Sequence, residues 1–84
     1  MTHEQILKMR PGTRVLCKDM RGLDPDMLLV FDHITFAGEA RFKRDNGKTW
    51  DASLDPIVPT ARGWKRPERG FEYVVLGYEG RNKL

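Results

Sequence analysis

The sequence predicts a single, mostly β domain whose five strands form a small barrel, preceded by one short N-terminal helix. Its 84 residues are enough for one domain and too few for two. Short β-prone runs alternate with turns rich in glycine and proline, as in all-β domains. Eight aromatic residues supply a core, although a chain of this length buries only roughly 60–65% of its unfolded surface. We therefore expect a thin core without a deep pocket.

The N-terminal segment, residues 1–10, is expected to be helical. Thr2 is a favourable N-cap residue, and Gln5 stands three positions later, as a capping box requires. The following proline and glycine end the helix. The barrel is expected over residues 11–78, and residues 79–84 form a polar tail of the same domain.

Two strands are predicted in the first half of the barrel. Residues 13–18 alternate in polarity, which places Val15 and Cys17 on one face. After a loop, residues 27–36 form a second strand that is apolar on both faces in its first half. The alternative is a helix over residues 26–31, because the acidic residues and proline that precede this run could also begin a helix.

A hairpin with a turn at residues 45–47 is the clearest local feature. A three-residue turn places Phe42 opposite Trp50, so that both side chains face the interior. A two-residue turn would place Phe42 opposite Asp51 instead. Burial favours the first register, in which Gly47 takes the left-handed position of a type I turn with a bulge.

The last third of the chain is predicted to contain one strand. Residues 53–59 are expected to form a bend or a 3₁₀ turn, because two prolines interrupt them. Residues 60–70 are expected to form a polar, basic loop without regular structure. Residues 71–78 are the most β-prone run and form the closing strand.

This order of elements resembles the SH3-like small β-barrels. Pro11 and Gly12 lead into the strand at residues 13–18, as at the entry to a first barrel strand. A longer loop, a central meander, a bend and a closing strand follow, so the likeness covers residues 11–78. The resemblance is one of architecture and brings no family motif. It therefore implies a fold and no particular function.

The residues that commonly carry catalysis or bind metals do not form a recognisable motif. Cys17, His3 and His33 lack the spacing of zinc ligands, and no glycine-rich phosphate-binding loop occurs. Ser53 is the only serine, and no general base is evident for it. Cys17 could pair with His33 as a nucleophile, but a buried thiol is the favoured interpretation. We expect no enzymatic activity, no cofactor and no metal.

Cellular location is expected to be cytoplasmic. A single cysteine cannot form an internal disulfide, which suits a reducing compartment. No apolar run approaches the ~18 residues that cross a membrane. Residues 1–10 lack the apolar core of a signal peptide. We therefore expect no membrane association.

Charge is unevenly distributed along the chain. The net charge is +3, from 15 basic and 12 acidic residues. Basic residues concentrate at residues 8–21, 41–48 and 62–69, whereas residues 22–40 hold four carboxylates and no Lys or Arg. If the basic segments converge in space, they form a patch suited to phosphates or to an acidic protein surface.

The candidate binding residues come from the outer face of the hairpin and from the basic loop. In the loop, a tryptophan flanked by cations could stack on a base while the cations hold phosphates. The alternative is that Trp64 folds back and closes the open end of the barrel. The seven candidates are Arg41, Lys43, Arg62, Trp64, Lys65, Arg66 and Arg69.

Two classes of function follow from these features. The first is a nucleic-acid-binding module that uses the basic loop and the hairpin face. The second is a small protein-interaction or inhibitor protein, such as an accessory protein of a phage or mobile element, that docks on a larger protein machine. A structural subunit that assembles through its strand edges is a weaker third interpretation. The sequence does not identify the partner or the oligomeric state.

Overall fold

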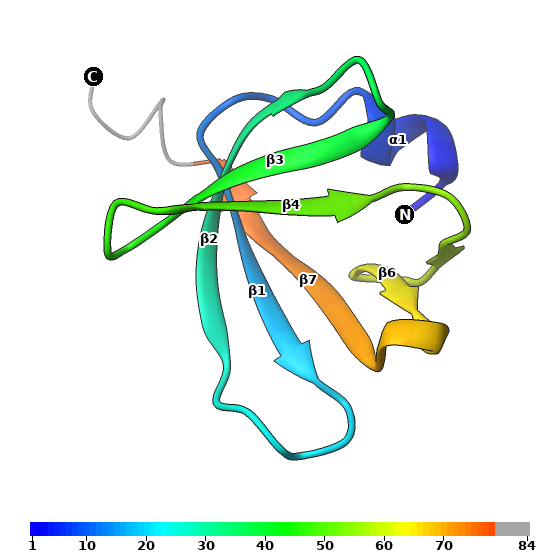
Figure 1. The fold of residues 1–84 in the computed structure, drawn as a ribbon. Coiled ribbons are helices and arrows are strands. Elements are labelled where there is room, and N and C mark those ends of the chain that lie inside the picture. The colour runs from blue at the N-terminus through cyan, green and yellow to red at the C-terminus, as the bar shows by residue number, and fades with distance from the viewer. Residues whose placement is uncertain (79–84) are drawn as a thin grey trace.

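The computed structural model describes residues 1–78 and shows a mostly β protein with one short helix (Figure 1). In chain order the elements are α1 (His3–Leu7), β1 (Thr13–Asp19), β2 (Met27–Ile34), β3 (Glu39–Arg44), β4 (Thr49–Ser53), β5 (Val58–Pro59), β6 (Gly63–Arg66), the 3₁₀ helix η1 (Pro67–Arg69) and β7 (Phe71–Tyr78). The expected tail, residues 79–84, lies outside the described residues.

All strands belong to one antiparallel sheet with the order β4-β3-β2-β1-β7-β6-β5. Figure 1 shows this sheet curled into a half-barrel, with β3 and β4 running across the direction of β1, β2 and β7. The first and last strands pair at the centre of the sheet, whereas β4 and β5 form its two edges. The mostly β class is confirmed, and the shape is compatible with a small barrel.

The prediction of five strands was wrong, because the sheet has seven. The additional strands, β5 and β6, lie within the segments expected to be a bend and an irregular loop. Trp64 of β6 pairs with Tyr73 of β7, and Lys65 of β6 pairs with Val58 of β5. A long strand such as β7 can order a polar neighbour that has no strand signal of its own, because it offers a row of backbone partners.

Buried aromatic and aliphatic side chains fill the concave side of the sheet. Trp64, Tyr73 and Phe42 form the centre, with Trp64 and Tyr73 stacked at 5.0 Å and Phe42 and Tyr73 at 6.1 Å between ring centroids. Ile6 of α1 is fully buried in the same cluster. The helix therefore closes part of the core, even though it is only five residues long.

The predicted capping box of α1 is confirmed. The Gln5 backbone N–H donates to Thr2 Oγ1 at 3.1 Å, and the Thr2 N–H donates to Gln5 Oε1 at 2.8 Å. Among residues 1–78, no helix is long and apolar enough to cross a membrane.

The hairpin of β3 and β4 has the predicted register. Phe42 pairs with Trp50 across a turn of three residues, and the Arg44 N–H donates to the Lys48 carbonyl at 2.8 Å. Gly47 adopts a φ of 83°, as the bulged turn requires. This hairpin brings Trp50 to the edge of the sheet, where it helps to form a groove.

The run after residue 26 is a strand, which decides against the alternative helix. β2 ends at Ile34, two residues earlier than predicted, because residues 35–38 turn back toward β3. The Gly38 N–H donates to the Thr35 carbonyl at 3.0 Å. Phe36 consequently lies outside the strand and is fully exposed.

Candidate binding surfaces

Trp64 lies in the core and is not available to a ligand in this fold. Its exposed fraction is 0%, and its ring stacks on Tyr73. The structure therefore does not show the exposed tryptophan that base stacking requires, and its burial agrees with the alternative in which the Trp64 side chain folds back. The reason is the β6–β7 pairing, which turns Trp64 toward the concave side of the sheet.

Arg41 is engaged in a two-pronged ion pair on the outer face of the hairpin. Its Nε and one terminal nitrogen each lie 2.9 Å from an oxygen of Asp51. This pairing raises the pKa of Arg41 and lowers the pKa of Asp51. Lys43, two residues further along β3, is exposed. Of these two candidates, Lys43 has the more accessible charge.

The other four cationic candidates are divided between two environments. Arg66 and Arg69 line a groove at the edge of the sheet. In the β6–β7 register, Lys65 lies opposite Glu72. Arg62 is exposed in the turn before β6. Three strands separate the β3 strand of Lys43 from the β6 strand of Lys65. The candidate cations therefore lie in two groups, one on β3 and the other on β6 and its flanking segments.

The groove that contains Arg66 and Arg69, here called the edge groove, runs between β4 and the η1–β7 junction. It has a volume of about 340 Å³. One side is formed by β4 with the start of β3, and the other by the end of β6, η1 and the start of β7. Its lining residues are Glu39, Trp50, Asp51, Ser53, Arg66, Arg69, Phe71 and Tyr73.

The base of the edge groove is aromatic. Trp50 meets Phe71 edge to face, at 5.7 Å between centroids and an interplanar angle of 82°. Trp50 Nε1 also donates to the Tyr73 hydroxyl at 3.2 Å. These contacts hold β4 against β7 across the gap in the half-barrel. They also fix the distance between the two sides of the groove.

Arg66 has a buried Nε atom with no hydrogen-bond partner in the structure. Arg66 lies two residues after Trp64 on β6, so its side chain begins on the same concave side of the sheet. Leaving a buried donor without an acceptor is unfavourable. An acceptor from a ligand in the edge groove would remove this deficit.

A smaller pocket of about 220 Å³ lies on the other side of the Trp50–Phe71 pair. Arg44 lines it and has a buried Nε atom without a hydrogen-bond partner. Asp19 also lines it, and hydrogen bonds from Arg21 lower the pKa of Asp19 to about 2. The Arg21 guanidinium carbon lies 5.6 Å from the centre of the Phe71 ring. Arginines therefore stand on both sides of the aromatic pair.

The Cys17 thiol is buried, and the Ser53 hydroxyl is hydrogen-bonded to the backbone. Burial raises the pKa of the Cys17 thiol to about 11, which opposes the thiolate form that a nucleophile needs. The Ser53 hydroxyl donates to the Asp55 carbonyl at 3.1 Å and accepts from the Asp55 N–H. Within residues 1–78, no group of three or more His, Cys, Asp or Glu side chains could hold a metal ion.

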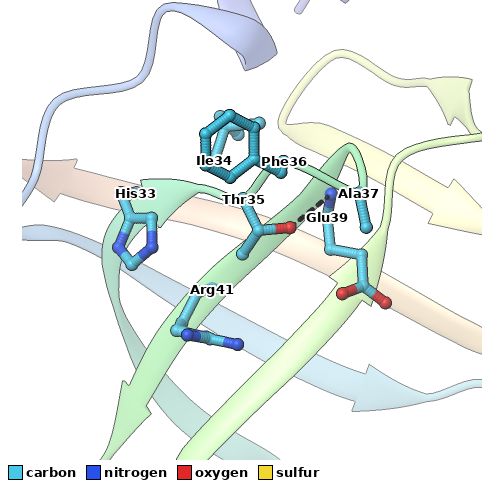
Figure 2. A pocket seen from close by; sticks show the side chains of 7 residues that line it. All are labelled: His33, Ile34, Thr35, Phe36, Ala37, Glu39 and Arg41. Carbon is cyan, nitrogen blue, oxygen red and sulfur yellow. Dashed lines mark hydrogen bonds between the residues drawn. The ribbon is translucent and has the colours of Figure 1, made fainter.

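Figure 2 shows a shallow, open depression at the turn between β2 and β3. Ile34 and Phe36 both line this depression, and Thr35 Oγ1 accepts from the Glu39 N–H at 3.3 Å. Arg41 lines the depression, but its guanidinium is already bound to Asp51. The sequence analysis selected Arg41 as a candidate binding residue in this region and did not select the exposed Phe36.

The convex side of the sheet carries an exposed apolar surface, here called the outer patch. Leu28 and Val30 of β2 are 39% and 37% exposed. Leu16 lies between Leu28 and Val74 in the sheet register, so these three side chains form one row across β2, β1 and β7. The outer patch consists of Leu16, Leu28, Val30 and Val74, of which Val74 is only 7% exposed, and Arg14 of β1 pairs with Val30 at its margin.

Charged residues border the outer patch on two sides. Lys43 pairs with Val30 in the β2–β3 register, and therefore lies beside it on the convex face. At the opposite end, Lys18 Nζ lies 3.7 Å from a carboxylate oxygen of Asp26. The sequence analysis noted that this strand is apolar on both faces in its first half, and the structure shows that one of these faces is partly exposed.

Comparison with known proteins adds no relative: no protein-family description, curated protein or solved structure matches the chain. The likeness to SH3-like barrels therefore stands at the level of a small, curled β sheet. What the surfaces can bind is argued from their own chemistry.

Proposed function

We propose that this protein is a non-enzymatic binding module and that its partner is another protein, which docks on the outer patch. The observation that carries this proposal is the exposure of Leu28 and Val30 on the convex face of β2, where Leu28 pairs with Leu16 of β1. An apolar centre with a charged border is typical of protein interfaces. Phosphates would instead contact the cations that flank this surface, Arg14 and Lys43, which pair with Val30 from its two sides.

The state of the catalytic candidates supports a non-enzymatic role. The Cys17 thiol is buried with a raised pKa, and the Ser53 hydroxyl is bound to the backbone of Asp55. Neither residue has a base positioned to activate it among the interactions of residues 1–78. We also propose a cytoplasmic location, in which a lone cysteine remains a thiol.

Nucleic acid is the second candidate partner, and the exposed cations favour it. Lys43, Arg62 and Arg69 are exposed, and the chain carries a net charge of +3. Such cations could contact a phosphate backbone without reading its sequence. The burial of Trp64 removes the residue that was expected to stack on a base. For this reason we place nucleic acid second.

Affinity purification from the native host, with and without nuclease, distinguishes the two partner classes. We expect a protein to be recovered under both conditions. A partner that disappears after nuclease treatment, with an affinity that falls steeply as salt rises, would instead support nucleic acid.

A charge introduced into the outer patch tests its role in that interaction. Leu28→Glu should abolish recovery of the partner, because it buries a carboxylate in the apolar centre of the interface. The matched control is Val58→Glu, since Val58 is 51% exposed on β5, and three strands lie between β5 and β2. If Leu28→Glu retains the partner while folding normally, the outer patch is not the interface.

A further inference from the structure

The free edge of β4 lies beside the edge groove. We propose that the edge groove binds an extended peptide segment that carries an acidic residue, which adds as a new strand to β4. This inference goes beyond the proposed function, because it concerns a different surface and does not require the outer patch.

The first step is the direction of the β4 backbone groups. The Arg44 N–H bonds to the Lys48 carbonyl, and the Leu54 N–H bonds to the Gly38 carbonyl. In an antiparallel pair of strands, facing residues that are hydrogen-bonded to each other through their backbones alternate with facing residues that are not. Trp50 and Ala52 therefore bond to β3.

The residues between these bonded positions point their backbone groups the other way. The N–H and C=O groups of Thr49, Asp51 and Ser53 turn away from β3. Because β4 is the last strand of the sheet order, no strand of the described chain pairs with them. Such an edge is a template for the addition of an extended peptide.

The edge groove lies along this free backbone. Asp51 and Ser53 line the groove from β4, while Arg66 and Arg69 line it from the opposite side. A strand added to β4 would therefore lie between the backbone groups of β4 and the two arginines. Its side chains would alternate between the concave side and the convex side.

The arginines that line the groove favour an acidic side chain on the concave side of the added peptide strand. A side chain placed beside Trp50 would point toward Phe71 and Arg66, which pair with each other in the β6–β7 register. The buried Nε of Arg66 has no acceptor, and a carboxylate offers two oxygens to a guanidinium. Asp51 does not satisfy Arg66, because its own carboxylate is bound to Arg41.

The edge also favours a peptide over a nucleic acid. The β4 edge offers carbonyl groups as well as N–H groups, and the carbonyl groups need donors. A peptide backbone supplies donors and acceptors in the same alternating order, whereas phosphates supply acceptors alone. Glu39, which also lines the groove, would repel a phosphate chain but accept a cation from a peptide of mixed charge.

The test uses the full chain and a fluorescently labelled nine-residue peptide, acetyl-Lys-Thr-Val-Thr-Glu-Thr-Val-Thr-Lys-amide. Affinity is measured by fluorescence anisotropy and compared with the same peptide in which Gln replaces the central Glu. We expect the Glu peptide to bind about tenfold more tightly or better, since a hydrogen bond between charged groups gains roughly that factor over a neutral one.

Matched protein variants assign this preference to Arg66. Arg66→Gln should remove the preference for Glu over Gln, whereas Lys65→Gln, one residue away and on the opposite face of β6, should retain it. Unfolding by urea confirms that both variants are folded. An unchanged preference in Arg66→Gln would overturn the assignment of the carboxylate to this arginine.

Modified peptides test strand addition without altering the protein. N-methylation of the amides on the edge that faces β4 should abolish binding, whereas N-methylation on the other edge should be tolerated. Equal effects of the two modifications, or no binding of the Glu peptide at millimolar concentration, would overturn the proposal. Displacement of the peptide by an oligonucleotide of nine nucleotides, with loss of that displacement in Arg66→Gln, would assign the groove to nucleic acid instead.

Discussion

Replacing Trp64 with alanine should mainly damage the fold and not a binding surface. Trp64 is fully buried and stacks on Tyr73 at 5.0 Å and on Phe42 at 6.4 Å. Truncation of a buried tryptophan to alanine typically costs about 3–5 kcal/mol, because transfer free energy is lost and a void remains. The stability of an 84-residue domain is roughly 4–13 kcal/mol in total. Trp64→Ala should therefore lose about a quarter of the stability or more.

Trp64→Phe is the matched control for this prediction. Phenylalanine keeps an aromatic ring in the stack and removes the buried Nε1–H, which has no hydrogen-bond partner in the structure. Removing an unsatisfied donor partly offsets the lost packing, so we expect a change of less than about 1.5 kcal/mol. The contrast between the two variants separates the loss of volume from the loss of the indole.

Urea denaturation followed by far-UV circular dichroism measures both effects. Thermal unfolding should show the same order, with Trp64→Ala lowering the midpoint by more than about 10 °C. A loss of less than about 1 kcal/mol in Trp64→Ala, together with weaker nucleic-acid binding, would refute the reasoning. That result would place the indole on an exposed loop after all.

Three further predictions follow from individual sites. Gly63→Ala should cost at least about 2–3 kcal/mol in urea unfolding, because a Cβ there would lie 1.9 Å from the Tyr73 carbonyl oxygen; a neutral effect would contradict the β6–β7 pairing. Cys17, with a pKa of about 11, should react slowly with a disulfide reagent at pH 8 in the native protein and rapidly in urea; rapid native labelling would show that the thiol is accessible. The pKa of Asp19 is about 2 in the fold against an ordinary value of 3.8, so its ionised form stabilises the protein above about pH 4, and that contribution is lost as the pH falls toward 2. Asp19→Asn should flatten this part of the pH dependence of urea unfolding, and a parallel dependence in both proteins would exclude the ion pair with Arg21.

Features that depend on neighbours in the sequence could be predicted well. The capping box of Thr2 and Gln5 needs only a spacing of three residues. The register of Phe42 and Trp50 follows from a short turn together with the cost of exposing their rings. Both the capping box and the hairpin register depend on a few positions that are close in sequence. For the hairpin, the alternative register would leave an apolar side chain in water.

The candidate site was only partly accessible to the same reasoning. Arg66 and Arg69 were singled out by their charge, and both line the edge groove, although their role in binding remains a prediction. The groove itself could not be foreseen, because Trp50 and Phe71 form its base from strands that are far apart in the sheet order. No local pattern encodes a contact of this kind.

The sequence by itself determined the β-rich class, the short N-terminal helix and the central hairpin, since local spacing and alternation specify them. The tertiary structure alone decided that residues 63–66 form a strand and that Trp64 belongs to the core. The physical reason is that a polar segment with one aromatic residue has no intrinsic preference strong enough to order it. It becomes ordered when β7 supplies backbone partners and Tyr73 supplies a surface on which the indole stacks.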